Sequence, residues 1–311
     1  MNLATSKVKR IEGVLSPVIT PFKKDYSPDA DRFVRHCRWL LNNGCAGLAI
    51  FGTNSEANSM SVAEKRKLLE ALVKGGVSPA ALMPGTGHCA ISDSIELTRA
   101  AVELGCGGVL MLPPFYYKGV SDEGLYRNFA EIIERVGDDR LQLYLYHIPP
   151  VSQVPITLAL IDQLLSKYPG IVAGVKDSSG DWSNTKAMLD AFAKNNFDVF
   201  AGSEVFLLDN MRHGGKGCIT ATGNVNPGAI DRVFKNWRST EADKLQAGIT
   251  ATRKIVQKQP MIPALKAIVA HFGNDAPWKT CRPPLTELTS AQEEELIRDL
   301  KGAGFTMPGL T

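Results

Sequence analysis

The alternation of short apolar runs with amphipathic stretches constrains the fold of this chain more than any other feature. Eight apolar runs, each three to seven residues long, predict buried strands, and the stretches between them carry apolar residues at helical spacing. Strands that alternate with helices favour a parallel sheet. Eight such units by about residue 237 favour a closed (β/α)8 TIM barrel. An open doubly wound sheet would carry a glycine-rich phosphate-binding turn after its first strand, and the sequence has none there.

The expected elements divide the α/β chain at about residue 237. We expect residues 1–237 to form the barrel with the functional site, and residues 238–311 to form a C-terminal helical extension packed on it. Ser61 and Glu64 make a capping box, which predicts that a barrel helix begins there. The expected strands lie at residues 14–20, 48–51, 81–83, 109–112, 141–146, 171–175, 199–201 and 218–221, and the late helices at about 240–257, 263–272 and 290–303.

Composition and charge exclude several classes of partner. The 311 residues are 44% hydrophobic and 22% charged, which is ordinary for a globular protein that buries a substantial core. Lys plus Arg number 35 and Asp plus Glu number 32, so the formal net charge is only +3. No basic run stands out either. This balance argues against nucleic acid and against a polybasic membrane surface as partners.

Targeting and cysteine patterns favour a cytoplasmic location. Residues 1–13 include basic side chains but no apolar segment follows, so we expect no secretory signal. The longest apolar runs, such as residues 109–114, are too short to cross a bilayer. The six cysteines form no CxxC pair and have no regular spacing, which is typical of reduced thiols in a cytosolic protein. The histidines lack ligand spacing, so we expect no metal site.

A lysine ends the sixth expected strand, in the sequence Gly174-Val175-Lys176-Asp177-Ser178. An amine held at the end of a buried strand is partly desolvated, which favours its neutral, nucleophilic form and suits it to Schiff-base chemistry. The alternative is that Lys176 only extends out of the sheet into water. In this barrel type the active site is built from the C-terminal ends of the strands. The residues that follow the other strands therefore decide between the two interpretations.

Three of those strand ends carry motifs that resemble one enzyme family. They are Gly52-Thr53-Asn54-Ser55-Glu56 after the second strand, Tyr146-His147-Ile148-Pro149 at the fifth, and Gly174-Val175-Lys176 at the sixth. Their types and order resemble the dihydrodipicolinate synthase and N-acetylneuraminate lyase family of pyruvate-dependent class I aldolases. The resemblance runs from about Gly13 to the C-terminal helices.

The resemblance implies a role for each matching residue. Lys176 would form an imine with the C2 ketone of pyruvate or another 2-oxo acid, and Tyr146 would move protons. Tyr116 would reach a neighbouring subunit's site, although the adjacent Tyr117 is an alternative for this role. Glu56 would brace its loop. The expected substrate-binding residues, with Thr53 and Asn54 at the substrate carboxylate, are Gly52, Thr53, Asn54, Ser178, Gly202, Ser203 and Ile219.

The family resemblance also implies a homotetramer built as a dimer of dimers, with no cofactor. One departure bears on the substrate. Synthases that make dihydrodipicolinate carry an arginine two residues after the Tyr-x-x-Pro proline, and Val151 stands at that place here. An arginine guanidinium can bind the carboxylate of the second substrate through two hydrogen bonds. Its absence here disfavours synthesis of dihydrodipicolinate.

We therefore expect a lyase that cleaves, or forms by condensation, a 4-hydroxy-2-oxo acid or 2-keto-3-deoxy sugar acid, with pyruvate and an aldehyde as products. A 2-keto-3-deoxy sugar acid dehydratase would use the same lysine and tyrosine and stays open. The alternative from another functional class is a protein that binds a 2-oxo acid without catalysing a reaction. Several polar side chains could bind substrate hydroxyls or could instead satisfy turn backbone, namely Asp177, Ser178, Ser179, Ser152 and Ser203.

Overall fold

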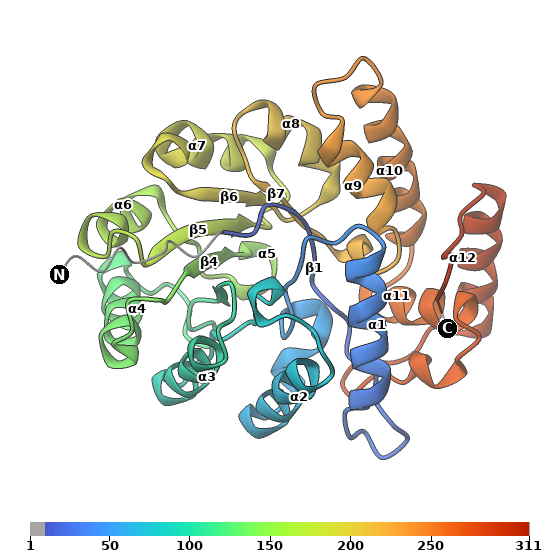
Figure 1. The fold of residues 1–311 in the computed structure, drawn as a ribbon, viewed down its shortest axis with the longest axis horizontal. Coiled ribbons are helices and arrows are strands. Elements are labelled where there is room, and N and C mark those ends of the chain that lie inside the picture. The colour runs from blue at the N-terminus through green and yellow to red at the C-terminus, as the bar shows by residue number, and fades with distance from the viewer. Residues whose placement is uncertain (1–9, 311) are drawn as a thin grey trace.

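The computed structural model describes residues 10–310 and shows a parallel sheet that curls round on itself (Figure 1). The expectation that no secretory signal precedes the barrel concerns residues that lie mostly outside this range. The named strands of the described chain lie in the spatial order β2-β1-β7-β6-β5-β4-β3, and each pair is parallel. They are β1 (Gly13–Ser16), β2 (Gly47–Leu48), β3 (Val109–Met111), β4 (Leu143–His147), β5 (Val172–Asp177), β6 (Asp198–Ala201) and β7 (Gly217–Ile219).

The expected strand at residues 81–83 is not a strand in the structure. A short 3-10 turn, Pro79–Ala81, occupies its beginning. The extended segment that follows makes isolated bridges to both edges of the sheet, Leu48 to Leu82 on one side and Gly85 to Leu110 on the other. Backbone hydrogen bonds still join the segment to both neighbours, from Met83 N–H to the Leu48 carbonyl and from Thr86 N–H to the Leu110 carbonyl, but Pro84 between the bridges has no N–H to add to them.

Helices surround the sheet on its outer side, as expected from the alternation in the sequence (Figure 1). Asp29 accepts a hydrogen bond from Arg32 N at the start of α1, and the capping box of Ser61 and Glu64 begins α2 as predicted. The outer helices are α1 (Ala30–Asn42), α2 (Val62–Lys74), α3 (Ile91–Glu103), α4 (Asp122–Val136), α6 (Leu158–Lys167), α7 (Trp182–Phe192), α8 (Leu207–Arg212) and α9 (Pro227–Lys235), and α5 (Pro149–Ser152) is a single turn after β4.

Alternate residues of the strands fill the interior of the curled sheet. Leu15, Tyr144, Phe200 and Ile219 belong to one apolar cluster, whereas their strand neighbours pack outward against the helices. This is the two-residue period of a strand whose two faces are both buried. Arg10 closes the N-terminal mouth, where its guanidinium donates to the Gln142 side chain and to the backbone carbonyls of Ala173 in β5 and Asn196 before β6.

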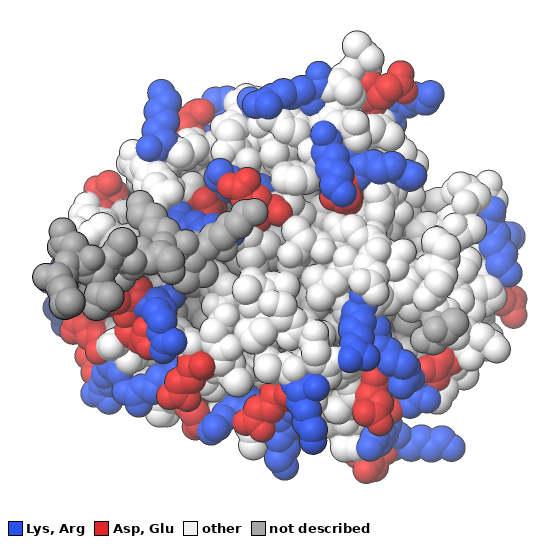
Figure 2. Space-filling view, in the orientation of Figure 1, with Lys and Arg blue, Asp and Glu red and all other residues white. Residues whose placement is uncertain are grey.

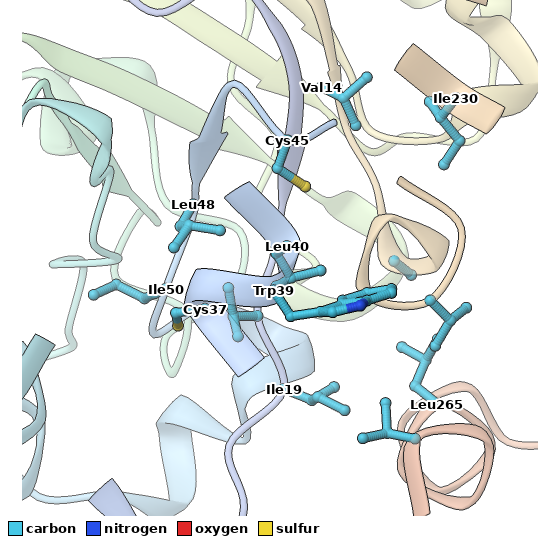
Figure 3. Close-up of a cluster of buried hydrophobic side chains, with 14 of the residues drawn as sticks. Val14, Ile19, Cys37, Trp39, Leu40, Cys45, Leu48, Ile50, Ile230 and Leu265 are labelled. Carbon is cyan, nitrogen blue, oxygen red and sulfur yellow. The ribbon is translucent and has the colours of Figure 1, made fainter. Parts of the chain in front are cut away.

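The C-terminal helices α10 (Ala242–Val256), α11 (Met261–Phe272) and α12 (Ser290–Gly302) lie to one side of the ring, next to α1 and α9 (Figure 1). Figure 3 shows Trp39 extending from α1 toward the C-terminal helices, near Leu265. Its indole N–H donates to the Pro308 carbonyl at 2.9 Å. One continuous apolar cluster includes residues of β1, α1, α9 and α11, so these helices share the core of the barrel.

The face drawn in Figure 2 carries acidic and basic side chains mixed around its rim, without a broad region of one sign. That distribution agrees with the balanced charge of the sequence. None of the helices formed by residues 10–310 has the length and hydropathy to cross a membrane. All six cysteines are free, and most are buried, although Cys89 is exposed.

Candidate active site

The centre of the candidate site is formed by two buried side chains on neighbouring strands. Tyr146 of β4 is paired in register with Lys176 of β5, and their exposed fractions are 3% and 4%. Because residues in register on parallel strands point the same way, both side chains enter the barrel interior. The Lys176 Nζ lies 4.1 Å from the centroid of the Tyr146 ring. The structure therefore places an amine and a phenol in direct contact at the C-terminal ends of the strands.

The loop after β2 brings a hydroxyl to this pair. The Oγ1 atom of Thr53 lies 3.3 Å from the Tyr146 Oη, within hydrogen-bonding distance. Thr53 begins a short 3-10 turn, Thr53–Ser55, and Asn54 is half-buried beside it. A Cβ atom on Gly52 would meet no atom within 4 Å, so the glycine leaves open space before the turn. Thr53, Tyr146 and Lys176 thus form one connected group.

The ends of β5 and β6 approach each other closely beside this group. The Gly202 N–H donates to the Asp177 carbonyl at 2.7 Å. A Cβ atom on Gly202 would lie 2.1 Å from the Ser178 Oγ and 2.6 Å from the Asp177 oxygen, so only glycine fits there. Ser178 and Ser203 are half-buried at this junction. Ile219 is fully buried in the interior cluster, at the end of β7.

Tyr116 does not join this group within one chain. Tyr116 and Tyr117 are both 73% exposed, and their rings pack edge to face with centroids 5.3 Å apart. The Lys118 ammonium donates to the Ser152 carbonyl at 2.7 Å, which holds the tyrosine loop against the turn after β4. Val151 in that turn is 60% exposed. The two tyrosines therefore present aromatic surface to the outside of the chain.

Several of the expected hydroxyl-binding side chains are used within the fold. The Asp177 carboxylate accepts from the hydroxyl of Thr185 at 2.5 Å and from that of Ser179 at 3.0 Å. The Ser152 hydroxyl donates to the Ile148 carbonyl at 3.0 Å. For Asp177, Ser179 and Ser152 the structure favours the alternative that they stabilise turns and strand ends.

Sequence reasoning missed a buried amine next to the site. Lys65 of α2 is almost fully buried, and its Nζ lies 2.7 Å from the His88 Nε2. Burial lowers the pKa of Lys65 to about 8. A narrow cavity that is lined by Lys65, Gly52 and Tyr146 connects this amine with the candidate site. In the sequence Lys65 lies among other charged residues of the helix, so nothing there indicated that its side chain is buried.

Sequence reasoning also missed the partners of two buried glutamates. Glu56 follows the Thr53–Ser55 turn and is ion-paired with Lys266, and both side chains are completely buried. Glu204 follows Ser203 and is paired with Arg253 at 3.1 Å. The expectation that Glu56 braces its loop agrees with these contacts. The cations lie far along the chain from the glutamates, so local spacing contained no sign of either pair.

Within the described range, no three or more His, Cys, Asp or Glu side chains gather in a way that could hold a metal ion.

Comparison with known proteins places these motifs in a family. The family model described as the dihydrodipicolinate synthetase family matches residues 10–303. An uncharacterized DapA-like lyase of Chloroflexus aurantiacus is 34% identical over 284 residues, which cover 90% of this chain and 93% of the relative.

Solved structures agree with this comparison. The dihydrodipicolinate synthase of Acinetobacter baumannii, solved in complex with pyruvate, superimposes with a TM-score of 0.85 at 27% identity and covers 95% of this chain and 99% of its own. A variant of the 2-keto-3-deoxygluconate aldolase of Sulfolobus solfataricus shares the fold, with a TM-score of 0.83 at 22% identity over 93% of this chain and 95% of its own.

Proposed function

Because the chain belongs to the dihydrodipicolinate synthetase family of lyases, we propose that it is a Schiff-base aldolase that cleaves a 4-hydroxy-2-oxo acid to pyruvate and an aldehyde. The observation that carries this proposal is the contact between the Lys176 amine and the Tyr146 ring, with the Thr53 hydroxyl beside the phenol. A nucleophile and a proton-transfer group that touch in a buried site are what imine chemistry requires.

The proposed reaction begins with attack of the Lys176 amine on the C2 carbonyl carbon. Tyr146 donates its proton to the departing hydroxyl, water leaves, and a protonated imine remains. The tyrosine phenolate then takes the proton of the 4-hydroxyl while the C3–C4 bond breaks. The electron pair of that bond enters the imine to give an enamine, and the aldehyde departs. Tyr146 returns the proton to C3, and water hydrolyses the imine to release pyruvate.

We assign binding of the common 2-oxo acid carboxylate to the loop after β2. Its turn offers the Thr53 and Asn54 side chains and backbone N–H groups, a suitable environment for an anion. Ser178, Gly202, Ser203 and Ile219 remain the expected contacts for the rest of the substrate.

Val151 supports a substrate without a second carboxylate. It stands where an arginine would clamp that group, and an exposed aliphatic side chain cannot do so. Sugar-derived 2-keto-3-deoxy acids with hydroxyl-bearing chains are therefore the substrates we expect.

The exposed tyrosine loop supports a homotetramer in which Tyr116 enters a neighbouring site. Tyr116 and Tyr117 are large, exposed and held by Lys118 against the turn after β4. Aromatic side chains of this kind are typical of protein interfaces. Sedimentation of the full chain, compared with a Tyr116→Ser variant, tests the assembly, and a monomeric wild type would contradict it.

Borohydride reduction with pyruvate, followed by peptide mapping, tests the mechanism. Among residues 10–310 the buried lysines are Lys65, Lys176 and Lys266, and we expect the reduced pyruvyl adduct on Lys176 alone. Lys176→Ala should abolish the adduct and all turnover while the fold is retained. Lys216→Met, which removes an exposed amine paired with Glu12, should change neither.

The outcomes of the test are distinct. An adduct on another lysine, or turnover by Lys176→Ala, would contradict the assignment. If the adduct forms on Lys176 but 2-keto-3-deoxy acids lose water without releasing pyruvate, the enzyme is a dehydratase. Pyruvate binding without turnover of any 2-oxo acid would identify a binding protein.

A further inference from the structure

The two loops proposed to hold substrate each end in a buried glutamate. Glu56 follows the Thr53–Ser55 turn after β2, and Glu204 follows Gly202 and Ser203 after β6. The Glu56 side chain is fully buried and that of Glu204 is 1% exposed. A buried carboxylate is stable only when hydrogen bonds or a cation replace its lost water. The partners of these two groups therefore decide where the loops lie.

The cation that faces Glu56 comes from helix α11. The Lys266 ammonium pairs with one Glu56 oxygen and donates to the Thr280 carbonyl at 2.7 Å. The second Glu56 oxygen accepts from the Arg282 backbone N–H at 2.8 Å. Lys266, Thr280 and Arg282 all lie beyond residue 260. Glu56 itself has a φ of 56°, a left-handed conformation that is uncommon for a residue with a side chain. These contacts offset the cost of that conformation.

The cation that faces Glu204 comes from helix α10. The Arg253 Nη1 lies 3.1 Å from one Glu204 oxygen. The hydroxyls of Thr220 and Thr222, which follow β7, donate to the two oxygens of the same carboxylate. Gln246 of α10 donates to the Glu204 backbone carbonyl at 2.9 Å. This network joins the ends of β6 and β7 to the C-terminal segment.

We propose that the C-terminal helices hold the two substrate loops in their working positions, with Lys266 and Arg253 as positioning residues that act through Glu56 and Glu204. Lys266 sets the place of Thr53, and thereby of the hydroxyl beside Tyr146. Arg253 sets the place of Gly202 and Ser203. That these loops bind substrate rests on the proposed function, whereas the positioning of the loops is a property of the fold.

Removal of one cation leaves a buried carboxylate without its counter-charge. The carboxylate then takes up a proton or its loop moves toward water, because an unpaired buried charge is costly, and either change removes the charged link that held the loop. The two pairs have no residue in common, so each loop responds to its own cation. Ion pairs near the surface behave differently, since water already solvates at least one partner. Lys258 with the half-buried Asp299 and Arg212 of α8 with the exposed Asp243 of α10 are such surface pairs.

The test compares Lys266→Met and Arg253→Met with the matched controls Lys258→Met and Arg212→Met, all in the full chain. Amide hydrogen exchange of peptides that cover residues 52–60 and 202–206 reports the opening of each loop. The pyruvate concentration that gives half-maximal borohydride trapping reports binding at the first loop. Thermal unfolding identifies variants that are unstable as a whole.

We expect Lys266→Met to speed exchange at residues 52–60, and Arg253→Met at residues 202–206, by at least about tenfold each, without effect on the other loop. Lys266→Met should also raise the half-maximal pyruvate concentration by about tenfold or more, and the adduct should still form on Lys176. Both controls should match the wild type. Wild-type exchange in the matching loop, or equal acceleration throughout the chain, would overturn the proposal.

The positioning of the loops can still be tested if Lys266→Met does not fold or if the proposed function is wrong. If Lys266→Met fails to fold, the double variant Glu56→Gln with Lys266→Met removes both charges, and it should fold with a loose loop at residues 52–60. Protected exchange there would overturn the role of Lys266. If the wild type forms no adduct on Lys176, the proposed function fails, and the exchange of the two loops still decides whether the C-terminal helices position them.

Discussion

At the scale of single residues, the candidate site depends on contacts between side chains of neighbouring strands. Tyr146 and Lys176 are thirty positions apart in the sequence, yet their strands pair in register and place the phenol against the amine. Thr53 reaches the same phenol from a third strand end. Each of the three residues lies in a short motif of its own in the sequence, and the chemistry arises from their contact in the fold.

Tyr146→Phe should lower turnover by roughly 10²–10⁴-fold, the usual cost of losing a general acid–base group, while imine formation on Lys176 still occurs slowly. The measurement is steady-state cleavage of a 2-keto-3-deoxy acid together with borohydride trapping. Tyr144→Phe is the matched control, because this tyrosine lies on the same strand and donates to Asp198 at 2.9 Å near the other mouth of the barrel. Turnover of Tyr146→Phe near the control value would place the proton transfer elsewhere.

At the scale of elements, the site depends on how closely the ends of neighbouring strands approach. The Gly202 backbone lies against Asp177 and Ser178 of the preceding strand end, without room for a side chain. Helix starts, in contrast, are local: the side-chain cap at Asp29 begins α1, and the capping box at Ser61 begins α2 where the sequence predicts it.

Gly202→Ala should separate the ends of β5 and β6. The added methyl group would meet backbone atoms at less than 3.0 Å, so the strands must shift. We expect a loss of about 1–3 kcal/mol in the free energy of unfolding and a rise in KM. Urea denaturation and steady-state kinetics measure the two effects.

Gly248→Ala on the exposed side of α10 is the control, since its methyl group meets nothing within 4 Å and should leave KM unchanged. Wild-type stability and KM in Gly202→Ala would show that the close approach is not needed.

At the scale of the whole molecule, the C-terminal helices complete the core of the barrel. His36 of α1 is buried between Trp39 and Trp278, with ring centroids 5.9 and 5.0 Å away, and Trp278 belongs to the C-terminal segment. Burial lowers the pKa of His36 to about 4, so the ring is neutral in the folded protein. A proton on this ring would place a charge at the junction of barrel and extension.

This histidine predicts a loss of stability in mild acid. Its pKa is about 4 when folded and about 6.5 when unfolded, so the unfolded chain binds more protons between these values. The free energy of unfolding should therefore fall as the pH drops from 6.5 to 4, by at most about 3 kcal/mol from this group. Glu64, whose pKa is held at about 2 by Arg282, loses its contribution only below about pH 4.5.

Urea denaturation across this pH range measures the effect as the difference between the wild type and His36→Leu. The stability of the variant should depend less on pH between 6.5 and 4, whatever its stability at pH 8. His213→Gln, at an exposed position, should keep the wild-type slope. If the free energy of unfolding depends on pH in the same way in the wild type and in His36→Leu, His36 is not the source of the acid sensitivity.

The sequence by itself determined the order of strands and helices, the starts of the capped helices and the motifs that place the chain in its family. Those features are local: hydrophobic periods of two and of 3.6 residues, side chains that cap a helix, and short runs of residues at strand ends. It overestimated the third strand, because Pro84 interrupts the ladder at a position where the hydrophobic pattern is still that of a strand.

Only the tertiary structure decided which groups meet. The contact of Lys176 with Tyr146, the closeness of Gly202 to Ser178 and the use of Asp177 within the fold follow from strand register and sheet curvature. The pairing of Glu56 with Lys266 joins residues 210 positions apart. Such contacts are invisible in the sequence, because burial and pairing depend on elements that come together only when the whole chain has packed.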